Sequence, residues 1–90
     1  MEIEFDPAKR QATLTERGLD MADAGSVFEG DTITFDDARF PYAKHRQITN
    51  GFLEGRMVVL AWTERGATRR IISMRKANER EKARYGPRFG

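Results

Sequence analysis

The spacing of hydrophobic residues changes along the chain, from a helical period in the first third to a strand period after residue 31. Glu2 to Phe5 alternates polar and apolar residues, which predicts a short strand. Asp6-Pro7 then offers an N-cap followed by proline at the first helical position, so we expect a helix over residues 7–16 that Gly18 ends. Asp20 can cap a second short helix reaching residue 28, and the two helices should pack as an antiparallel pair.

The rest of the chain predicts an antiparallel meander followed by a C-terminal helix. Strands are expected over residues 32–35, 46–53, 57–63 and 68–74, with a loop over 38–44 and a tight hairpin at 54–56. Met57–Trp62 is apolar at every position, which is typical of a central strand covered on both faces, and places Trp62 in the core. Residues 77–85 favour a helix that Gly86-Pro87 ends. The fold class predicted is therefore α+β.

Length and composition restrict the number of domains, the kinds of site and the location that the chain can have. A chain of 90 residues with 39% hydrophobic and 33% charged residues predicts one domain over 1–90. It contains no cysteine, which excludes disulfides and zinc-thiolate sites. Its longest apolar run is far shorter than the ~20 residues of a membrane-spanning helix, and its first residues do not form a signal peptide. We therefore expect a cytoplasmic protein with no membrane partner.

The net charge of +2 conceals an asymmetry between the two parts of the chain. Residues 1–64 hold 7 Lys or Arg and 12 Asp or Glu, whereas residues 65–90 hold 9 basic residues and only 2 acidic ones, Glu79 and Glu81. A basic end of this kind favours a polyanionic partner, either nucleic acid or an acidic protein, although an ordinary solvated charged surface has the same composition.

Several short stretches together resemble the BrnT family of type II toxin-antitoxin ribonucleases. The first half contributes Phe5-Asp6 with Lys9, Arg17-Gly18-Leu19-Asp20 and Val27-Phe28. The second half contributes Arg46 entering a strand that ends in Gly51, the run Trp62-Thr63-Glu64-Arg65-Gly66, and the run Arg70-Ile71-Ile72-Ser73-Met74-Arg75-Lys76-Ala77 followed by Glu81 and Tyr85. The last run is the most specific part, and the resemblance covers nearly the whole chain.

The resemblance implies a RelE-like fold and an activity. Similar toxins cleave RNA without a metal or cofactor, and a co-encoded antitoxin, BrnA, holds them inactive and connects them indirectly to operator DNA. Four residues depart from the family pattern, and Phe5, which stands where the family usually has tryptophan, keeps an aromatic side chain. The other three change the chemistry: Glu16 and Arg17 stand where the family usually has lysine and histidine, and His45 stands where an acidic residue is common. These departures support an alternative, a catalytically inactive partner and co-repressor of a DNA-binding antitoxin.

Metal-independent RNA cleavage needs cations facing the phosphate, because negative charge grows on its oxygens in the transition state. Arginine suits this role, since its guanidinium binds phosphate oxygens bidentately and stays charged. Arg75, in the most specific run, is the first candidate, and Arg46, at the start of another strand, is the second. The alternative for either arginine is an ordinary ion pair with Glu64 or Glu81.

The reaction also needs a base for the 2′-hydroxyl proton and an acid for the leaving 5′-oxygen. His45, Glu64 and Tyr85 are the candidates, and a pair of histidines is impossible because His45 is the only one. The alternatives are a solvated histidine, a solvated glutamate in a turn, and a tyrosine ring that covers the sheet or stacks on a base. Sequence-independent attraction to the RNA backbone is expected from a group of basic residues: Arg65, Arg70, Lys76, Arg80 and Arg84.

Overall fold

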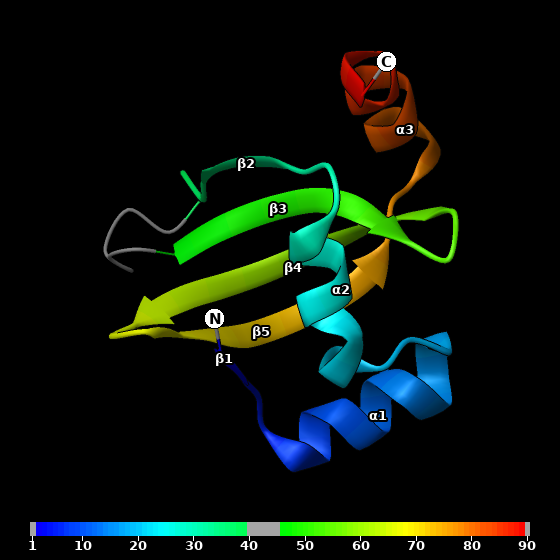
Figure 1. Cartoon of the computed structure of the whole chain (residues 1–90). Coiled ribbons are helices and arrows are strands. Elements are labelled where there is room, and N and C mark those ends of the chain that lie inside the picture. The colour runs from blue at the N-terminus through cyan, green and yellow to red at the C-terminus, as the bar shows by residue number, and fades with distance from the viewer. Residues whose placement is uncertain (1, 40–45, 90) are drawn as a thin grey trace.

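A five-stranded sheet with helical segments on both of its faces forms the computed structural model of this chain, which describes residues 2–39 and 46–89 (Figure 1). The strands are β1 (Glu2–Glu4), β2 (Ile33–Asp36), β3 (Arg46–Leu53), β4 (Arg56–Arg65) and β5 (Thr68–Lys76). The helices are α1 (Pro7–Arg17), α2 (Ala24–Glu29) and α3 (Glu79–Tyr85), with 3-10 turns at Met21–Asp23 and Gly86–Phe89. The predicted α+β class is confirmed.

The strand order is β1-β5-β4-β3-β2, so the predicted meander from β2 to β5 is confirmed. The sequence did not predict the place of β1, which pairs parallel to β5 with Glu2 opposite Thr68 and Glu4 opposite Arg70. Of the expected loop at 38–44, only Ala38 and Arg39 are among the described residues.

Local capping explains where α1 begins and ends. The Asp6 carboxylate accepts a hydrogen bond from the backbone N–H of Ala8 at 2.8 Å, and Gly18 ends the helix with a positive φ of 68°. Arg17, in the last turn, donates to the backbone carbonyl of Met74 at 2.9 Å, which holds α1 against β5.

The second helical segment differs from its prediction. Asp20 caps the 3-10 turn, and α2 follows it as a separate helix of 6 residues. Figure 1 shows α2 in front of the strands and at a steep angle to α1, so the expected antiparallel helix pair is wrong. The physical reason is that the 3-10 turn redirects the chain, which lets the buried Ala24 and Val27 join the core of the sheet.

The face of the sheet that α1 and α2 cover carries the larger core. Every residue of Met57–Trp62 is buried, as predicted for a central strand. Trp62 is 4% exposed, packs edge-to-face on Phe28 and donates its indole N–H to the hydroxyl of Thr49 at 2.7 Å. The predicted place of Trp62 in the core is thereby confirmed.

A β-bulge in β5 decides which side chains reach the other face. Ala61 pairs with Ser73, but Trp62 pairs with Ile71, so one extra residue of β5 lies between these two pairs. In a regular strand Arg70 and Arg75, five residues apart, would point to opposite faces. Because the bulge adds a residue, both arginines lie on the same face, which is the one opposite α1 and α2. We call this the arginine face: the side of β3, β4 and β5 that carries Arg46, Arg70 and Arg75.

Helix α3 covers only part of the arginine face. Its N-terminus has a capping box, in which Asn78 accepts from the N–H of Glu81 at 2.8 Å and Glu81 accepts from the N–H of Asn78 at 2.9 Å. Ala77, predicted as the first helical residue, instead precedes this cap and is buried on the arginine face. The following 3-10 turn is held by Phe89, which packs edge-to-face on Phe52.

Candidate functional site

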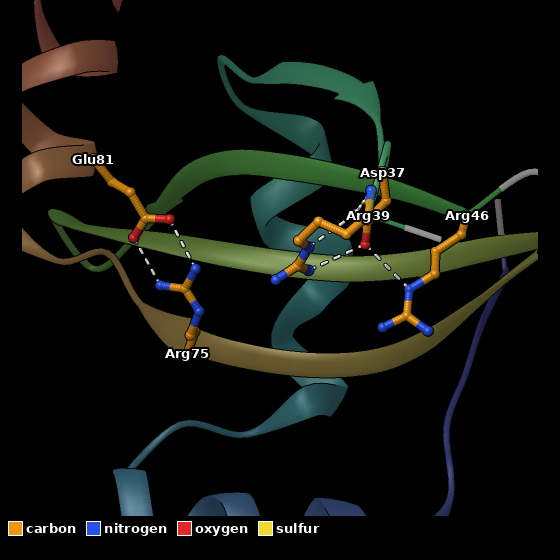
Figure 2. A network of polar contacts seen from close by, with 5 residues as sticks. All are labelled: Asp37, Arg39, Arg46, Arg75 and Glu81. Carbon is orange, nitrogen blue, oxygen red and sulfur yellow. Dashed lines mark hydrogen bonds and ion pairs between the residues drawn. The ribbon is translucent and has the colours of Figure 1, made fainter. Parts of the chain in front are cut away.

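Arg46 and Arg75 come from different strands and point to the same side of the sheet. Arg46 lies opposite Thr63 and Arg75 lies opposite Val59, and positions 59 and 63 of β4 share one face. Figure 2 shows both guanidinium groups beside β4, with Arg39 between them in this view. The two arginines that the sequence singled out are therefore on one surface, together with a third that it did not.

Arg75 is held by Glu81 of α3. Its two terminal nitrogens, Nη1 and Nη2, donate to Oε1 and Oε2 of the glutamate, each at 2.7 Å. The alternative of an ion pair with Glu81 is thus what the structure shows for this residue. The pair is open to solvent, since 41% of the Arg75 side chain and 20% of the Glu81 side chain are exposed. The guanidinium is therefore both oriented and accessible to an anion.

Asp37 holds the other two arginines. Arg39 donates from Nε and Nη2 to the two carboxylate oxygens of Asp37, at 3.0 and 3.1 Å, and Arg46 donates from Nε at 3.3 Å. The Asp37 side chain is only 2% exposed, against 69% for Arg39 and 23% for Arg46. A buried carboxylate thus fixes two guanidinium groups beside each other, and neither Arg46 nor Arg75 pairs with Glu64.

Asp37 and Arg39 were not among the residues that the sequence singled out. Asp37 falls between the expected strand over 32–35 and the expected loop over 38–44, and the two residues after it form a turn. A signal was nevertheless present, because Phe35 and Asp37 are two residues apart and so lie on the same side of a strand. Arg39 gave no such signal, since its direction depends on the turn that follows Asp37.

The electrostatics of this cluster keep both carboxylates ionised. The pKa of Asp37 is lowered from its ordinary value, first because Arg39 donates hydrogen bonds to the carboxylate, while burial works in the opposite direction. The pKa of Glu81 is lowered chiefly by the hydrogen bonds from Arg75. Carboxylates with lowered pKa values are weak bases, so Asp37 and Glu81 act here by orienting cations.

We expect the fold to lose stability in acid because of these pairs. A carboxylate with a lowered folded-state pKa stabilises the protein above its unfolded pKa of about 4, and this contribution disappears as the pH falls through the lowered value. Asp37→Asn should therefore reduce the free energy of unfolding at pH 7, and its difference from the native protein should shrink below pH 4. Urea denaturation at pH 7 and pH 3 measures this, and an equal difference at both pH values would contradict it.

A hollow of about 330 Å³ lies beside the cluster. Arg39 and Arg75 line it together with Phe35 and Ile48. The Phe35 ring stacks on Tyr85 of α3, with centroids 5.7 Å apart and an angle of 22° between the planes. Tyr85 therefore packs against the sheet at the margin of the arginine cluster, which is one of the arrangements that the sequence left open.

The remaining predicted site residues lie in other places. Glu64 is exposed and pairs in register with Arg69, on the same face as Trp62, so it is on the opposite side of the sheet from Arg75. Arg69 itself lies over the Trp62 ring, at 4.4 Å from its centroid. His45 falls outside the described residues. Glu64 and His45 as proton-transfer groups stay predictions from the sequence.

The predicted RNA-binding residues spread over three parts of the surface. Arg65 and Arg70 lie on the arginine face and share Glu4 of β1, at 3.3 and 2.7 Å. Exposed positions at the end of β5 and on α3 carry the others: Lys76, Arg80 and Arg84. By its register opposite Val58, Lys76 lies on the other face of the sheet from Arg75.

Across 2–39 and 46–89, no group of three or more His, Asp or Glu side chains suited to hold a metal ion is present. No helix in the same ranges is both long and apolar enough to cross a membrane.

Comparison with known proteins identifies the family. A search of curated proteins gave no match to the sequence. Residues 5–81 match the family described as "Ribonuclease toxin, BrnT, of type II toxin-antitoxin system", a segment that includes β2 to β5, Arg46, Arg75 and Glu81. Since this match covers most of the chain, the protein belongs to the BrnT family of ribonuclease toxins of type II toxin-antitoxin systems.

Proposed function

We propose that this protein is an endoribonuclease that cleaves RNA by attack of a 2′-hydroxyl on the adjacent phosphate, with side chains rather than a metal ion stabilising the charge. The attacking oxygen forms a bond to phosphorus, and the bond from phosphorus to the 5′-oxygen breaks. A base takes the 2′-hydroxyl proton and an acid protonates the leaving 5′-oxygen, which leaves a 2′,3′-cyclic phosphate and a 5′-hydroxyl end. The family description supports ribonuclease activity in general.

The observation that carries the proposal is the gathering of Arg46, Arg39 and Arg75 on one accessible surface (Figure 2). Donors that are already oriented toward a developing charge lower the barrier without reorganising during the reaction. Asp37 and Glu81 provide this orientation by bidentate contacts with Arg39 and Arg75. Tyr85 is the predicted proton-transfer residue that lies nearest to this surface among the described ones, through its contact with Phe35.

The products test the mechanism directly. The purified protein should cut a labelled single-stranded RNA in the presence of EDTA and leave fragments that end in a 2′,3′-cyclic phosphate. The same strand with 2′-O-methyl groups at every position should stay intact, because the attacking hydroxyl is blocked. Cleavage of the 2′-O-methyl strand, or cleavage that EDTA abolishes, would contradict the proposal.

A cognate antitoxin of the BrnA kind is the proposed protein partner, and contact with operator DNA would pass through that antitoxin. Membership of a type II toxin-antitoxin family supports a protein antitoxin. We also propose a cytoplasmic location, where RNA and antitoxin are both present, and a single folded domain over the whole chain. Production of the protein alone in a bacterium should arrest growth, and co-production of the antitoxin encoded beside it should restore growth.

The alternative is a partner module without catalytic activity. It is favoured by Arg17, which stands where a family histidine is expected and whose guanidinium contacts the backbone of Met74 rather than the arginine cluster. Harmless accumulation of the protein in the growth experiment, together with intact RNA in vitro, would support this alternative.

Binding to RNA should weaken steeply with salt, because each phosphate contact releases counterions. In a plot of the logarithm of affinity against the logarithm of salt concentration, each phosphate contact with a single strand should make the slope steeper by about 0.7. Arg80→Gln on exposed α3 should therefore reduce the slope for a 2′-O-methyl strand by about 0.7. Lys9→Gln on α1, which lies on the other side of the sheet, is the matched control. An unchanged slope for the Arg80 variant would remove this residue from the binding surface.

A further inference from the structure

An exposed aromatic ring stands beside the arginine cluster. Phe35 lies on β2, at the edge of the sheet, and 39% of this large apolar residue is exposed. Tyr85 stacks on the ring and thereby fixes its orientation. Ile48 lies opposite Phe35 on the neighbouring strand, on the same face of the sheet. An aromatic side chain that is held in place and still exposed is suited to stack on a planar ligand.

Phe35 and two arginines of the cluster line the same hollow. Its volume of about 330 Å³ lies in the lower part of the ~300–1,000 Å³ range of pockets that hold small ligands. Phe35 and Ile48 supply apolar lining, and Arg39 and Arg75 supply guanidinium groups. Three carboxylates complete the polar lining, and two of them are the ion-pair partners of those arginines: Asp37, Glu81 and Asp36. This combination matches a nucleotide, whose base is flat and apolar on its faces and whose phosphate is an anion.

We propose that Phe35 is a base-stacking residue, and that this hollow binds the base of one nucleotide next to the phosphodiester held by Arg75. The inference rests on the proposed nuclease function and gives it a substrate: single-stranded RNA, whose bases are free to unstack and pack on aromatic side chains. Besides its predicted part in proton transfer, Tyr85 supports Phe35 by stacking on its ring.

The helix geometry explains how one element serves both parts of the site. Glu81 and Tyr85 are four residues apart and so lie on the same side of α3. Glu81 orients Arg75 on β5, while Tyr85 stacks on Phe35 of β2. Phosphate contact and base contact are therefore fixed relative to each other by a single helix, which favours one distance between the scissile phosphate and the stacked base.

The test uses strands with one cleavable bond, made by placing a single ribonucleotide in a 2′-O-methyl RNA. Two further strands carry an abasic site on either side of that bond. Base-to-aromatic stacking contributes about 1–3 kcal/mol, so for the native protein one abasic strand should show a kcat/KM lower by about 5-fold to over 100-fold. Phe35→Leu should lose this discrimination, and Phe35→Trp should keep it. Phe52→Leu is the matched control, because Phe52 is also 39% exposed and also packs on an aromatic residue of the C-terminal segment.

The outcomes separate the inference from the function on which it rests. A native protein that cleaves no strand would overturn the proposed function. A native protein that cleaves, with a Phe35→Leu variant that discriminates against the abasic strand as the native protein does, would overturn base stacking and leave the nuclease intact. If Phe35→Leu does not fold, quenching of 2-aminopurine fluorescence in a 2′-O-methyl strand bound to the native protein decides the question, since a stacked base is quenched and an unstacked one is not.

Discussion

Arg75→Ala should abolish RNA cleavage while the protein stays folded. Removing one preoriented donor from a site of developing negative charge typically lowers kcat by about 10²–10³. Arg75 is the candidate with the strongest orientation, because both terminal nitrogens are fixed by Glu81 at 2.7 Å. Its side chain is 41% exposed, and an ion pair at such a position contributes ~0–1 kcal/mol to stability. We therefore expect the melting temperature to fall by no more than a few degrees.

Glu81→Gln separates the two roles of Arg75. This variant breaks the ion pair but retains the positive charge on β5, and the glutamine side chain can still accept the N–H of Asn78 in the capping box. If Arg75 acts on the phosphate, Glu81→Gln should lower cleavage far less than Arg75→Ala. If the role of Arg75 is only to hold α3 against the sheet through Glu81, the two variants should lose RNA cleavage equally. Cleavage by Arg75→Ala at the native rate would remove Arg75 from the site.

The strands of the meander and the ends of α1 were predictable because they depend on local chemistry. Asp6 and Gly18 determine the limits of α1 through their side chain and backbone, wherever the helix packs. The continuous apolar run of β4 predicts burial on both faces, and both faces are covered. The direction of α2 and the pairing of β1 with β5 depend on contacts between distant segments, which hydrophobic periodicity does not encode.

The candidate site was predictable only in part, for a related reason. Arg46 and Arg75 were found because they lie in regular strands within a specific motif. Their shared surface, however, depends on the register between strands and on the bulge near Ile72, and a change of one residue in either reverses the face. Asp37 is the first residue after β2, and Arg39 lies in the turn that follows, where side-chain direction no longer has a period. Glu64 was chosen for its neighbours along the chain, and the sheet separates it from Arg75.

Gly51→Ala should destabilise the fold. Gly51 lies in the middle of β3 beneath α2, where a Cβ atom would come within 2.6 Å of Cγ1 of Val27 and 3.2 Å of Cγ2 of Thr32. Val27 is 0% exposed and belongs to the core, so it has little room to move away. Overpacking of this kind typically costs ~1–3 kcal/mol, more than the ~0.4–1 kcal/mol that alanine gains by restricting the unfolded chain. A domain of this size then melts about 4–8 °C lower for each kcal/mol lost.

A double-mutant cycle with Val27→Ala isolates the steric cause. Val27→Ala alone creates a cavity beneath α2 and is itself destabilising, but it removes the Cγ1 atom that the new Cβ would meet. The double variant should therefore be more stable than the sum of the two single effects predicts, by roughly 0.5–3 kcal/mol in urea denaturation. Strict additivity would mean that α2 shifts as a unit instead of meeting the new Cβ through Val27. In folded protein Gly51→Ala should retain cleavage, because the arginine face lies on the opposite side of the sheet from α2; the pattern is thus the reverse of that expected for Arg75→Ala.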